Sequence, residues 1–188
     1  TFPLALAAAA AALPSASRSA TELVLNGGFE YEMGGWSCAP GNGCALDNSV
    51  APHSGVLGML LQSGDGTTVL GQSFETVVGA VYSLSFWVRW TEPGTAGDAA
   101  WWSAGDVALG SITNISGDFA QVLAQFVATS ETTTLNFNVH TNGTGALALD
   151  DISVTEGTAP SPVPLPASAA LLGLGLTGLA ALRRRDRS

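Results

Sequence analysis

The sequence predicts an all-β domain, an antiparallel β-sandwich, between two terminal targeting segments. From Glu22 to Thr155 the chain breaks into short runs in which apolar and polar residues alternate, and Gly, Asn, Asp and Ser separate these runs. None of the runs has a helical period. The segment contains no Lys and is rich in Gly, Thr, Ser, Asn and Val, a composition that disfavours long helices and suits short strands with tight turns.

The expected strands lie within a domain that spans 22–156. They are the runs LVLN, LGMLLQ, TVLGQSFE, VYSLSFWVRW, AAWWSAGDVAL, FAQVLAQFVA, TTTLNFNVH and ALALDDISV. Several short strands at this spacing are typical of a sandwich of two antiparallel sheets.

The charge of this domain is strongly acidic. Arg89 is the only basic residue between Thr21 and Thr158, whereas 14 of the chain's 15 acidic residues lie there, so the formal charge of this window is −13. Such a domain should repel nucleic acid and anionic lipid, and we expect no nucleic-acid partner. It could attract divalent cations, and an ordinary solvated acidic surface is the alternative.

Residues 1–19 are predicted to be a signal peptide. TFPLALAAAAAALP is an apolar, Ala-rich stretch followed by small residues, the pattern of a secretory apolar region and its cleavage site. Small residues allow cleavage after Ser17 or after Ser19. The first residue is Thr1, so we expect the initiator Met to be missing. A buried Ala-rich helix is the alternative to export.

The C-terminal end has three parts. Residues 157–167 form a Pro-rich spacer, which cannot be helical throughout because Pro lacks the amide donor. Residues 168–182 are uncharged and predict a transmembrane helix. Residues 183–188 form a tail that should stay cytoplasmic, and its basic residues are Arg183, Arg184, Arg185 and Arg187. A plain single-span anchor is the simplest interpretation of this arrangement.

The order of short motif, apolar helix and terminal Arg cluster resembles the PEP-CTERM sorting signal in its VPLPA variant. The motif residues are Val163, Pro164, Leu165, Pro166 and Ala167, and Leu165 stands where the commonest form has Glu. The resemblance implies a partner, an exosortase-type membrane protease of a Gram-negative bacterium. It also implies that the protein is exported, transiently anchored in the inner membrane, cleaved, and delivered to the cell surface or exopolysaccharide matrix.

Alternation along two of the expected strands places polar groups suited to sugars opposite the core. An aromatic ring can cover the C–H face of a sugar, and planar polar groups can bond its hydroxyls. The candidate glycan-binding residues are Trp87, Arg89, Asn136, Asn138 and His140. The alternative is two solvated strand faces with Trp87 covered by a loop. Trp101 and Trp102 are adjacent, so one should be buried and the other exposed as a second stacking candidate.

The segments LVLNGGFEYEMGGW, APHSGVLGMLL and ALALDDISV resemble the jelly-roll sandwich of carbohydrate-binding modules and the related galactose-binding-like family. The resemblance implies binding of extracellular polysaccharide and a structural calcium ion that ties the N-terminal turn to the last strand. The implied ligands are the Gly28 carbonyl, the Glu30 carboxylate, a backbone carbonyl in the His53–Gly55 turn, taken as that of Ser54, and a carboxylate of Asp150 or Asp151.

Asp150 supports the calcium hypothesis on physical grounds. In ALALDDISV it shares a strand face with the apolar residues Ala148, Ile152 and Val154. A buried carboxylate without a partner is very costly, and Arg89 is the only candidate cation of the domain, so a metal ion is a reasonable partner. Hydrogen bonds from backbone amides are the alternative.

The chain has two cysteines, and they lie close together. Cys38 and Cys44 lie in a Gly- and Pro-containing loop, and in an exported protein we expect them to form a disulfide.

No nucleophile–base arrangement or marked pair of carboxylates is present, so we expect no enzyme activity. Two classes remain: a glycan-binding module, or a structural surface or matrix protein with no specific sugar ligand.

Overall fold

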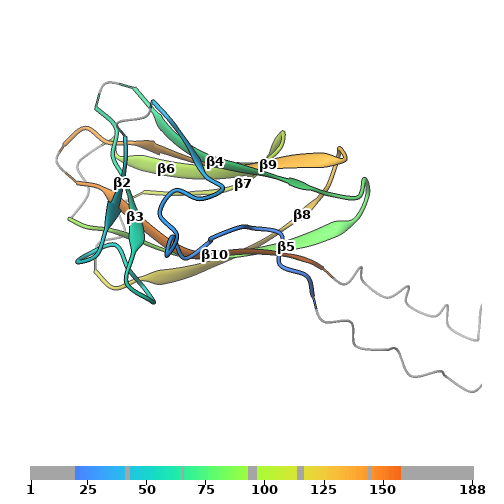
Figure 1. Cartoon of the computed structure of the whole chain (residues 1–188). Coiled ribbons are helices and arrows are strands. Elements are labelled where there is room, and N and C mark those ends of the chain that lie inside the picture. The colour runs from blue at the N-terminus through green and yellow to red at the C-terminus, as the bar shows by residue number, and fades with distance from the viewer. Residues whose placement is uncertain are drawn as a thin grey trace, which may run out of the picture. The chain divides into compact units, whose positions relative to one another are not determined.

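The computed structural model describes residues 20–40, 43–64, 66–92, 97–113, 117–143 and 145–157. The chain divides into two units, Thr1–Gly157 and Thr158–Ser188, and the second lies outside the described residues. The described part contains ten strands and no helix (Figure 1): β1 (Ser37–Ala39), β2 (Cys44–Asp47), β3 (Gly58–Leu61), β4 (Thr68–Glu75), β5 (Val81–Trp90), β6 (Ala99–Ala104), β7 (Val107–Ile112), β8 (Ala120–Val127), β9 (Thr132–His140) and β10 (Leu147–Glu156).

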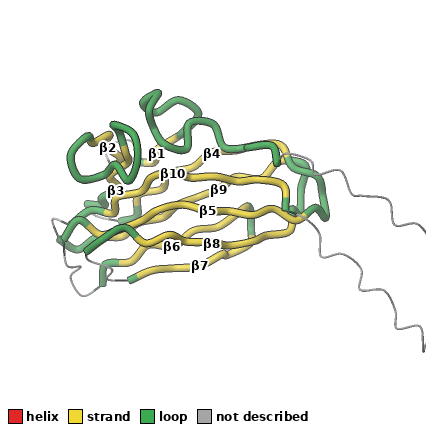
Figure 2. The backbone as a smooth tube through the Cα atoms, turned by 90° about the horizontal axis from the view of Figure 1, so that it is seen from below, coloured by secondary structure: helices red, strands yellow, loops and turns green. Residues whose placement is uncertain are grey.

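The strands form two five-stranded sheets, and every pairing within them is antiparallel. One sheet has the order β1-β4-β9-β6-β7 and is called sheet I; the other has the order β2-β3-β10-β5-β8 and is called sheet II. Figure 2 shows the strands of the two layers running roughly along each other. The predicted antiparallel sandwich is therefore confirmed, and its two sheets are consistent with a jelly roll.

The core lies between the two sheets and follows the alternation of the sequence. In β5 the side chains of Tyr82, Leu84, Phe86, Val88 and Trp90 are all buried. In β9 the buried residues include Leu135, Phe137 and Val139. The rings of Phe86 and Phe137 meet edge to face with 5.0 Å between their centroids, so the contact joins the two sheets. Burial of each such side chain contributes about 1.5–3 kcal/mol to folding.

The expected first strand, LVLN, does not form. The residue before it, Glu22, makes an isolated bridge to Thr155, and the Leu23 amide donates to the Val154 carbonyl (2.9 Å). The Gln72 side chain takes the place of a strand partner, because its Oε1 accepts a hydrogen bond from the Leu25 amide (2.7 Å) and its Nε2 donates to the Leu25 carbonyl (2.9 Å). A side chain that satisfies the backbone in this way competes with a regular ladder.

A bulge in β10 positions the segment that follows LVLN. The register between β10 and β5 shifts between Asp150 and Ser153, and Asp151 has a positive φ of 50°. The Ile152 amide turns outward and donates to the Gly27 carbonyl (3.0 Å). A Cβ atom at Gly27 would lie only 1.8 Å from the Ile152 carbonyl oxygen, so this approach requires glycine.

The predicted terminal segments fall outside the described residues. These are the signal peptide (1–19), the spacer beyond Gly157, the helix at 168–182, and the tail at 183–188. Within the part of the chain that is described, no helix is long and apolar enough to cross a membrane.

Candidate functional site

The outer face of sheet I carries one group of candidate residues. The strand register places five residues in one row across the sheet, one from each strand: Ser111, Trp101, Asn138, Val69 and Ala39. Residues paired across antiparallel strands point to the same face. Because the neighbours of Asn138 in β9, Phe137 and Val139, are buried in the core, this row faces outward.

The next row of the same face surrounds one amide with small residues. It consists of Ala108, Ser103, Asn136, Gly71 and Ser37. A Cβ atom at Gly71 would lie 2.8 Å from Asn136 Oδ1, so the glycine makes room for this amide. The Ser37 hydroxyl donates to the Gly71 carbonyl (3.1 Å) and stays close to the sheet. The side chains of this row are therefore short, and the half-buried Asn136 is the largest polar one.

Trp101 is the exposed aromatic residue of this face. Its side chain is 38% exposed, whereas its neighbour Trp102 is 6% exposed in the core, which confirms the prediction that one of the pair is buried and one is not. Asn138 lies beside it and donates from Nδ2 to the Trp101 carbonyl (3.3 Å). An exposed indole beside two amides can stack on one face of a sugar ring while the amides bond its hydroxyls.

His140 lies at the end of β9, where it limits this face. One ring nitrogen, Nδ1, is 2.6 Å from the Gly66 carbonyl oxygen and the other, Nε2, is 3.2 Å from Asn142 Oδ1. Both nitrogens are thus engaged by neighbouring loops. These two contacts join the end of β9 to the loops that contain Gly66 and Asn142.

The structure does not bring the five candidate glycan-binding residues together. Trp87 and Arg89 lie on β5 of sheet II, whereas Asn136, Asn138 and His140 lie on β9 of sheet I. Both sets point outward, and the core separates them. Similar alternation on two strands defines which residues are exposed, but it does not determine which sheet each strand joins.

Trp87 is covered by a loop, which is the alternative that the sequence left open. The His53 ring stacks on it with 3.9 Å between centroids and an interplanar angle of 11°. Phe119 meets His53 edge-on, with 5.3 Å between centroids, and Arg89 lies over the Phe119 ring at 5.0 Å. The Arg89 guanidinium also donates to the Val50 carbonyl. Trp87 and Arg89 therefore help to fix the 50–54 loop on sheet II.

The residues implied as calcium ligands do lie together, in contrast to the glycan set. Asp150 is fully buried, and its Oδ2 accepts hydrogen bonds from the amides of His53 (2.7 Å) and Ser54 (3.0 Å). Asp151 accepts from the Ser54 hydroxyl (2.7 Å) and is 2.7 Å from His53 Nδ1. A Cβ atom at Gly28 would lie within 3.8 Å of both carboxylates.

Glu30 joins this cluster from the N-terminal turn. Its Oε1 accepts from the amides of Val56 (2.7 Å) and Leu57 (2.9 Å), which lower the pKa of the Glu30 carboxyl below its usual range. Burial raises the pKa of Asp150, and the backbone amides that bond it only partly oppose this effect. Asp151 acts as a nearby negative charge on both.

This cluster satisfies its buried carboxylate with backbone amides. Among the described residues, no three His, Cys, Asp or Glu side chains converge as a ready-made metal site. Calcium also binds carbonyl and hydroxyl oxygens, and the cluster combines three interacting carboxylates with the Gly28 backbone and the Ser54 turn. As they lie, these oxygens could serve a calcium ion only if side chains such as Asp151 turned toward it.

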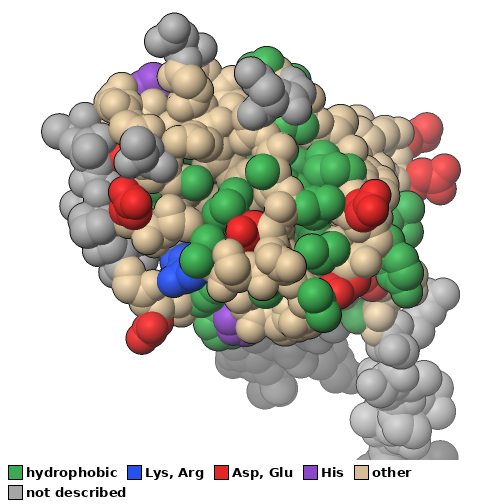
Figure 3. All heavy atoms as spheres, turned by 60° about the vertical axis from the view of Figure 1, so that its left-hand side comes forward, with side chains coloured by type: hydrophobic (Ala, Val, Ile, Leu, Met, Phe, Trp, Pro, Cys, Tyr) green, Lys and Arg blue, Asp and Glu red, His purple; other side chains and the backbone are tan. Residues whose placement is uncertain are grey.

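Other acidic side chains are spread over the surface. Figure 3 shows acidic side chains lying apart from one another on a face that is otherwise mostly uncharged, with one small basic area. In the described part of the chain Arg89 is the only Lys or Arg. Most of the described acidic residues are exposed, and they thus form a solvated acidic surface.

The predicted disulfide is present and links the two sheets. Cys38 lies in β1 of sheet I and Cys44 begins β2 of sheet II, and their sulfur atoms are bonded. The bond closes the sandwich at the end where both sheets have their shortest strands.

The chain belongs to a family of carbohydrate-binding domains, because the family model described as "Carbohydrate binding domain" matches residues 21–146, more than half of the sequence. Domains of this type are non-catalytic. No curated protein matches the sequence.

Solved structures resemble the sandwich in fold. TmCBM61 in complex with beta-1,4-galactotriose is 16% identical, with a TM-score of 0.57 over 73% of this chain and 99% of that one. A "Family 16 Carbohydrate Binding Module-2" is 21% identical, with a TM-score of 0.56 over 71% and 99%. The CBM22-1–GH10 modules of a Clostridium thermocellum xylanase, complexed with xylohexaose, are 16% identical, with a TM-score of 0.52 over 72% and 28%. At these identities the likeness establishes the fold alone.

Proposed function

We propose that this chain is a non-catalytic protein that binds an extracellular polysaccharide on the outer face of sheet I. The observation that carries the proposal is the row in which the exposed Trp101 lies directly beside Asn138, next to the row of short side chains around Asn136. Membership of a carbohydrate-binding family supports the ligand class. The loop that covers Trp87 argues against an equivalent platform at that position on sheet II.

The physical basis of binding is a stacked ring with hydroxyls bonded at its edge. The Trp101 indole would lie against the C–H face of one sugar, and Asn136 and Asn138 would bond hydroxyls of that sugar and the next. An aromatic contact and a few hydrogen bonds, offset by ordering of the glycan, leave about 4–6 kcal/mol of binding free energy. This corresponds to a Kd of about 1 mM to 50 µM per site.

The test is affinity electrophoresis of the full chain through gels that contain single polysaccharides. We expect at least one neutral polysaccharide to retard the protein, and Trp101→Ala to weaken the retardation by about tenfold or more. Trp87→Ala is the matched control, because it removes the same side chain from the covered face. Retardation lost in Trp87→Ala but kept in Trp101→Ala contradicts the proposed face, and no retardation on any glycan favours the structural matrix protein.

We also propose that calcium binds at the cluster of Glu30, Asp150, Asp151, the Gly28 backbone and the Ser54 turn. A bound ion would offset two of the negative charges of the three neighbouring carboxylates and tie the N-terminal turn to β10. We expect calcium to raise Tm relative to chelator, and Asp151→Asn to remove that difference. Asp118→Asn, a substitution elsewhere on the exposed surface, should retain it. Equal Tm values in calcium and in chelator contradict the proposal.

The proposed place of action is outside the cell. The disulfide and the carbohydrate-binding fold support export. The sorting step through 163–167 by an exosortase-type protease, with transient anchoring in the inner membrane of a Gram-negative bacterium, rests on the resemblance of the C-terminal segment alone. A mass spectrum of the surface-released protein should lack the tail at 183–188, and a spectrum that retains it contradicts cleavage.

A further inference from the structure

β8 is an exposed edge strand without the features that usually keep edges apart. It is the last strand of sheet II, and among the described residues its strand partner is β5 alone. Its eight residues, AQVLAQFV, include no charge and no proline. Soluble proteins usually protect an edge by shortening it, charging it or covering it, because unpaired amides and carbonyls recruit another strand. The edge strands β1 and β2 are protected by their short length, since they have three and four residues.

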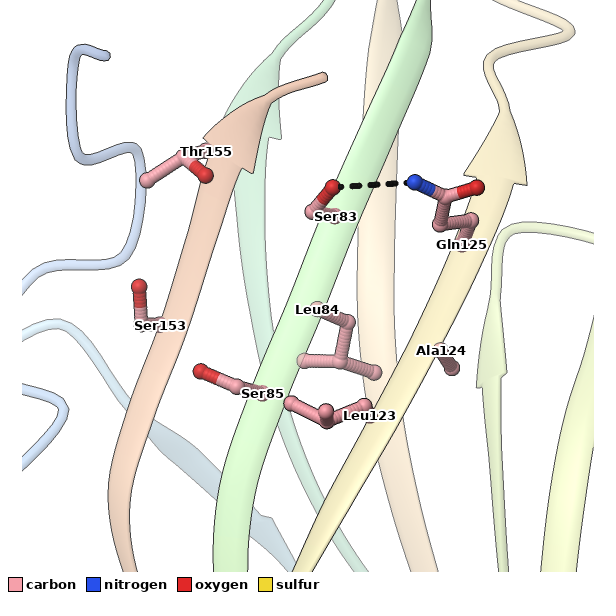
Figure 4. A pocket seen from close by; sticks show the side chains of 8 residues that line it. All are labelled: Ser83, Leu84, Ser85, Leu123, Ala124, Gln125, Ser153 and Thr155. Carbon is pink, nitrogen blue, oxygen red and sulfur yellow. Dashed lines mark hydrogen bonds between the residues drawn. The ribbon is translucent and has the colours of Figure 1, made fainter. Parts of the chain in front are cut away.

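Leu123, at the middle of β8, is 73% exposed because its neighbours are small. In the register it lies opposite Ser85 of β5, which in turn lies opposite Ser153 of β10. These serines form the bottom of an open groove of about 560 Å³, and Leu123 and Gln125 form its β8 side (Figure 4). Gln125 reaches over it to the Ser83 hydroxyl (3.4 Å). The leucine is thus an apolar side chain that its own sheet leaves uncovered.

The outward side chains of β8 are arranged symmetrically about Leu123. Gln121 and Gln125 lie two residues before and after it on the same face. If two copies of β8 pair antiparallel with Leu123 opposite Leu123, each Gln121 lies opposite the partner's Gln125. Leucine then covers leucine, and amide meets amide, which can donate and accept at once. A two-fold antiparallel contact requires side chains that are arranged symmetrically about its central residue, as the two glutamines are about Leu123.

Charge also favours a second copy at this edge over other faces. The domain window carries −13, so most contacts between two copies bring like charges together. β7, which lies beside β8 along the same side of the sandwich (Figure 2), contains no charged residue either. This side of the described domain is therefore one on which two acidic copies can approach without facing strand carboxylates.

We propose that two copies of this chain associate through antiparallel pairing of their β8 strands, centred on Leu123, to form a continuous ten-stranded sheet. The two-fold axis of such a pair is perpendicular to the sheet, so the outer faces of sheet I in both copies point in the same direction. If that face binds glycan, the dimer presents two sites to one polysaccharide surface, and weak sites gain avidity. The dimer itself does not depend on the glycan site.

The contact is small, so we expect concentration-dependent association. Pairing centred on Leu123 matches residues 120–126 of one copy with the same residues of the other. Strands of this length bury less area than a standard stable interface of about 800 Å² per partner. Sedimentation of the full chain in mild detergent should show dimer at high micromolar concentration. Q121K/Q125K places like charges opposite each other and should weaken association by about tenfold or more, whereas Q121K/Q125E places opposite charges there and should retain it. Equal association of these two variants overturns the proposal, as does a monomer at about 1 mM.

A crosslink tests the centre of the contact independently. Both cysteines of the chain are in the disulfide, so Leu123→Cys introduces the sole free thiol. A short thiol crosslinker should join two Leu123→Cys chains at least tenfold faster than two Val78→Cys chains, whose exposed position lies in the β4–β5 turn. Because any association through the segment beyond 157 is the same in both variants, equal crosslinking rates contradict pairing at Leu123.

Discussion

Trp101 and Trp87 have the same side chain and the same outward position on a strand, but their surroundings differ. Trp101 is 38% exposed, and its register neighbours are the smaller polar residues Ser111 and Asn138. Trp87 has a stacked imidazole 3.9 Å away. The difference arises from the 50–54 loop, which crosses sheet II and not sheet I. A stacking platform is therefore defined by what covers the ring, and alternation alone does not reveal this.

Asp47 gives a residue-scale prediction on pH. Burial alone would raise its pKa, but hydrogen bonds from the amides of Val50, Ala51 and Ser49 lower the pKa to about 2, from a usual value of 3.8. A depressed folded-state pKa stabilises the fold above the unfolded pKa, and this contribution is lost as the pH falls through about 2.

We therefore expect Asp47→Asn to lower the free energy of unfolding by about 1 kcal/mol at pH 5, after allowance for solvent screening. The difference from the parent should shrink as the pH falls from about 4 to about 2. Urea unfolding at both ends of this range measures it, with Asp106→Asn as the exposed control. A difference that stays constant over the range would show that the carboxylate charge at Asp47 is not the cause.

At the scale of elements, alternation predicted most strands and the inward faces of β5 and β9. It did not predict that β5 and β9 belong to different sheets, because pairing is decided by packing and chain crossovers far apart in sequence. The run LVLN fails for a local reason, since the Gln72 side chain replaces the ladder at Leu25. The convergence of Glu30, Ser54 and Asp150 was expected from family resemblance, and no spacing in the sequence would have indicated it.

The disulfide between β1 and β2 provides an element-scale prediction. It closes a loop with a sequence separation of 6 and joins the two sheets at their shortest strands. The disulfide restricts the unfolded chain over this loop, and this raises the free energy of unfolding by about 2 kcal/mol. The double variant Cys38→Ser/Cys44→Ser should therefore unfold at a lower urea midpoint. The dependence of its free energy of unfolding on urea concentration should be unchanged or slightly steeper, because the unfolded chain expands without the bond. An unchanged midpoint would mean that the turn is already ordered without the bond.

At the scale of the whole described domain, each surface has a distinct character. The outer face of sheet I carries Trp101 and the amides, and the outer face of sheet II is partly covered by the 50–54 loop beside the carboxylate cluster. The side formed by β7 and β8 carries no strand charges. The proposed glycan face, calcium site and dimer contact therefore lie on separate parts of the domain.

The most direct test of the proposed glycan face is side-chain NMR during titration with an oligosaccharide from the polysaccharide that retards the protein. We predict that the Trp101 indole and the side-chain amides of Asn136 and Asn138 shift together, while the Trp87 indole and the Gln125 amide stay in place. Shifts confined to Trp87 or to the groove beside Gln125, with Trp101 unchanged, would contradict the assignment of glycan binding to sheet I.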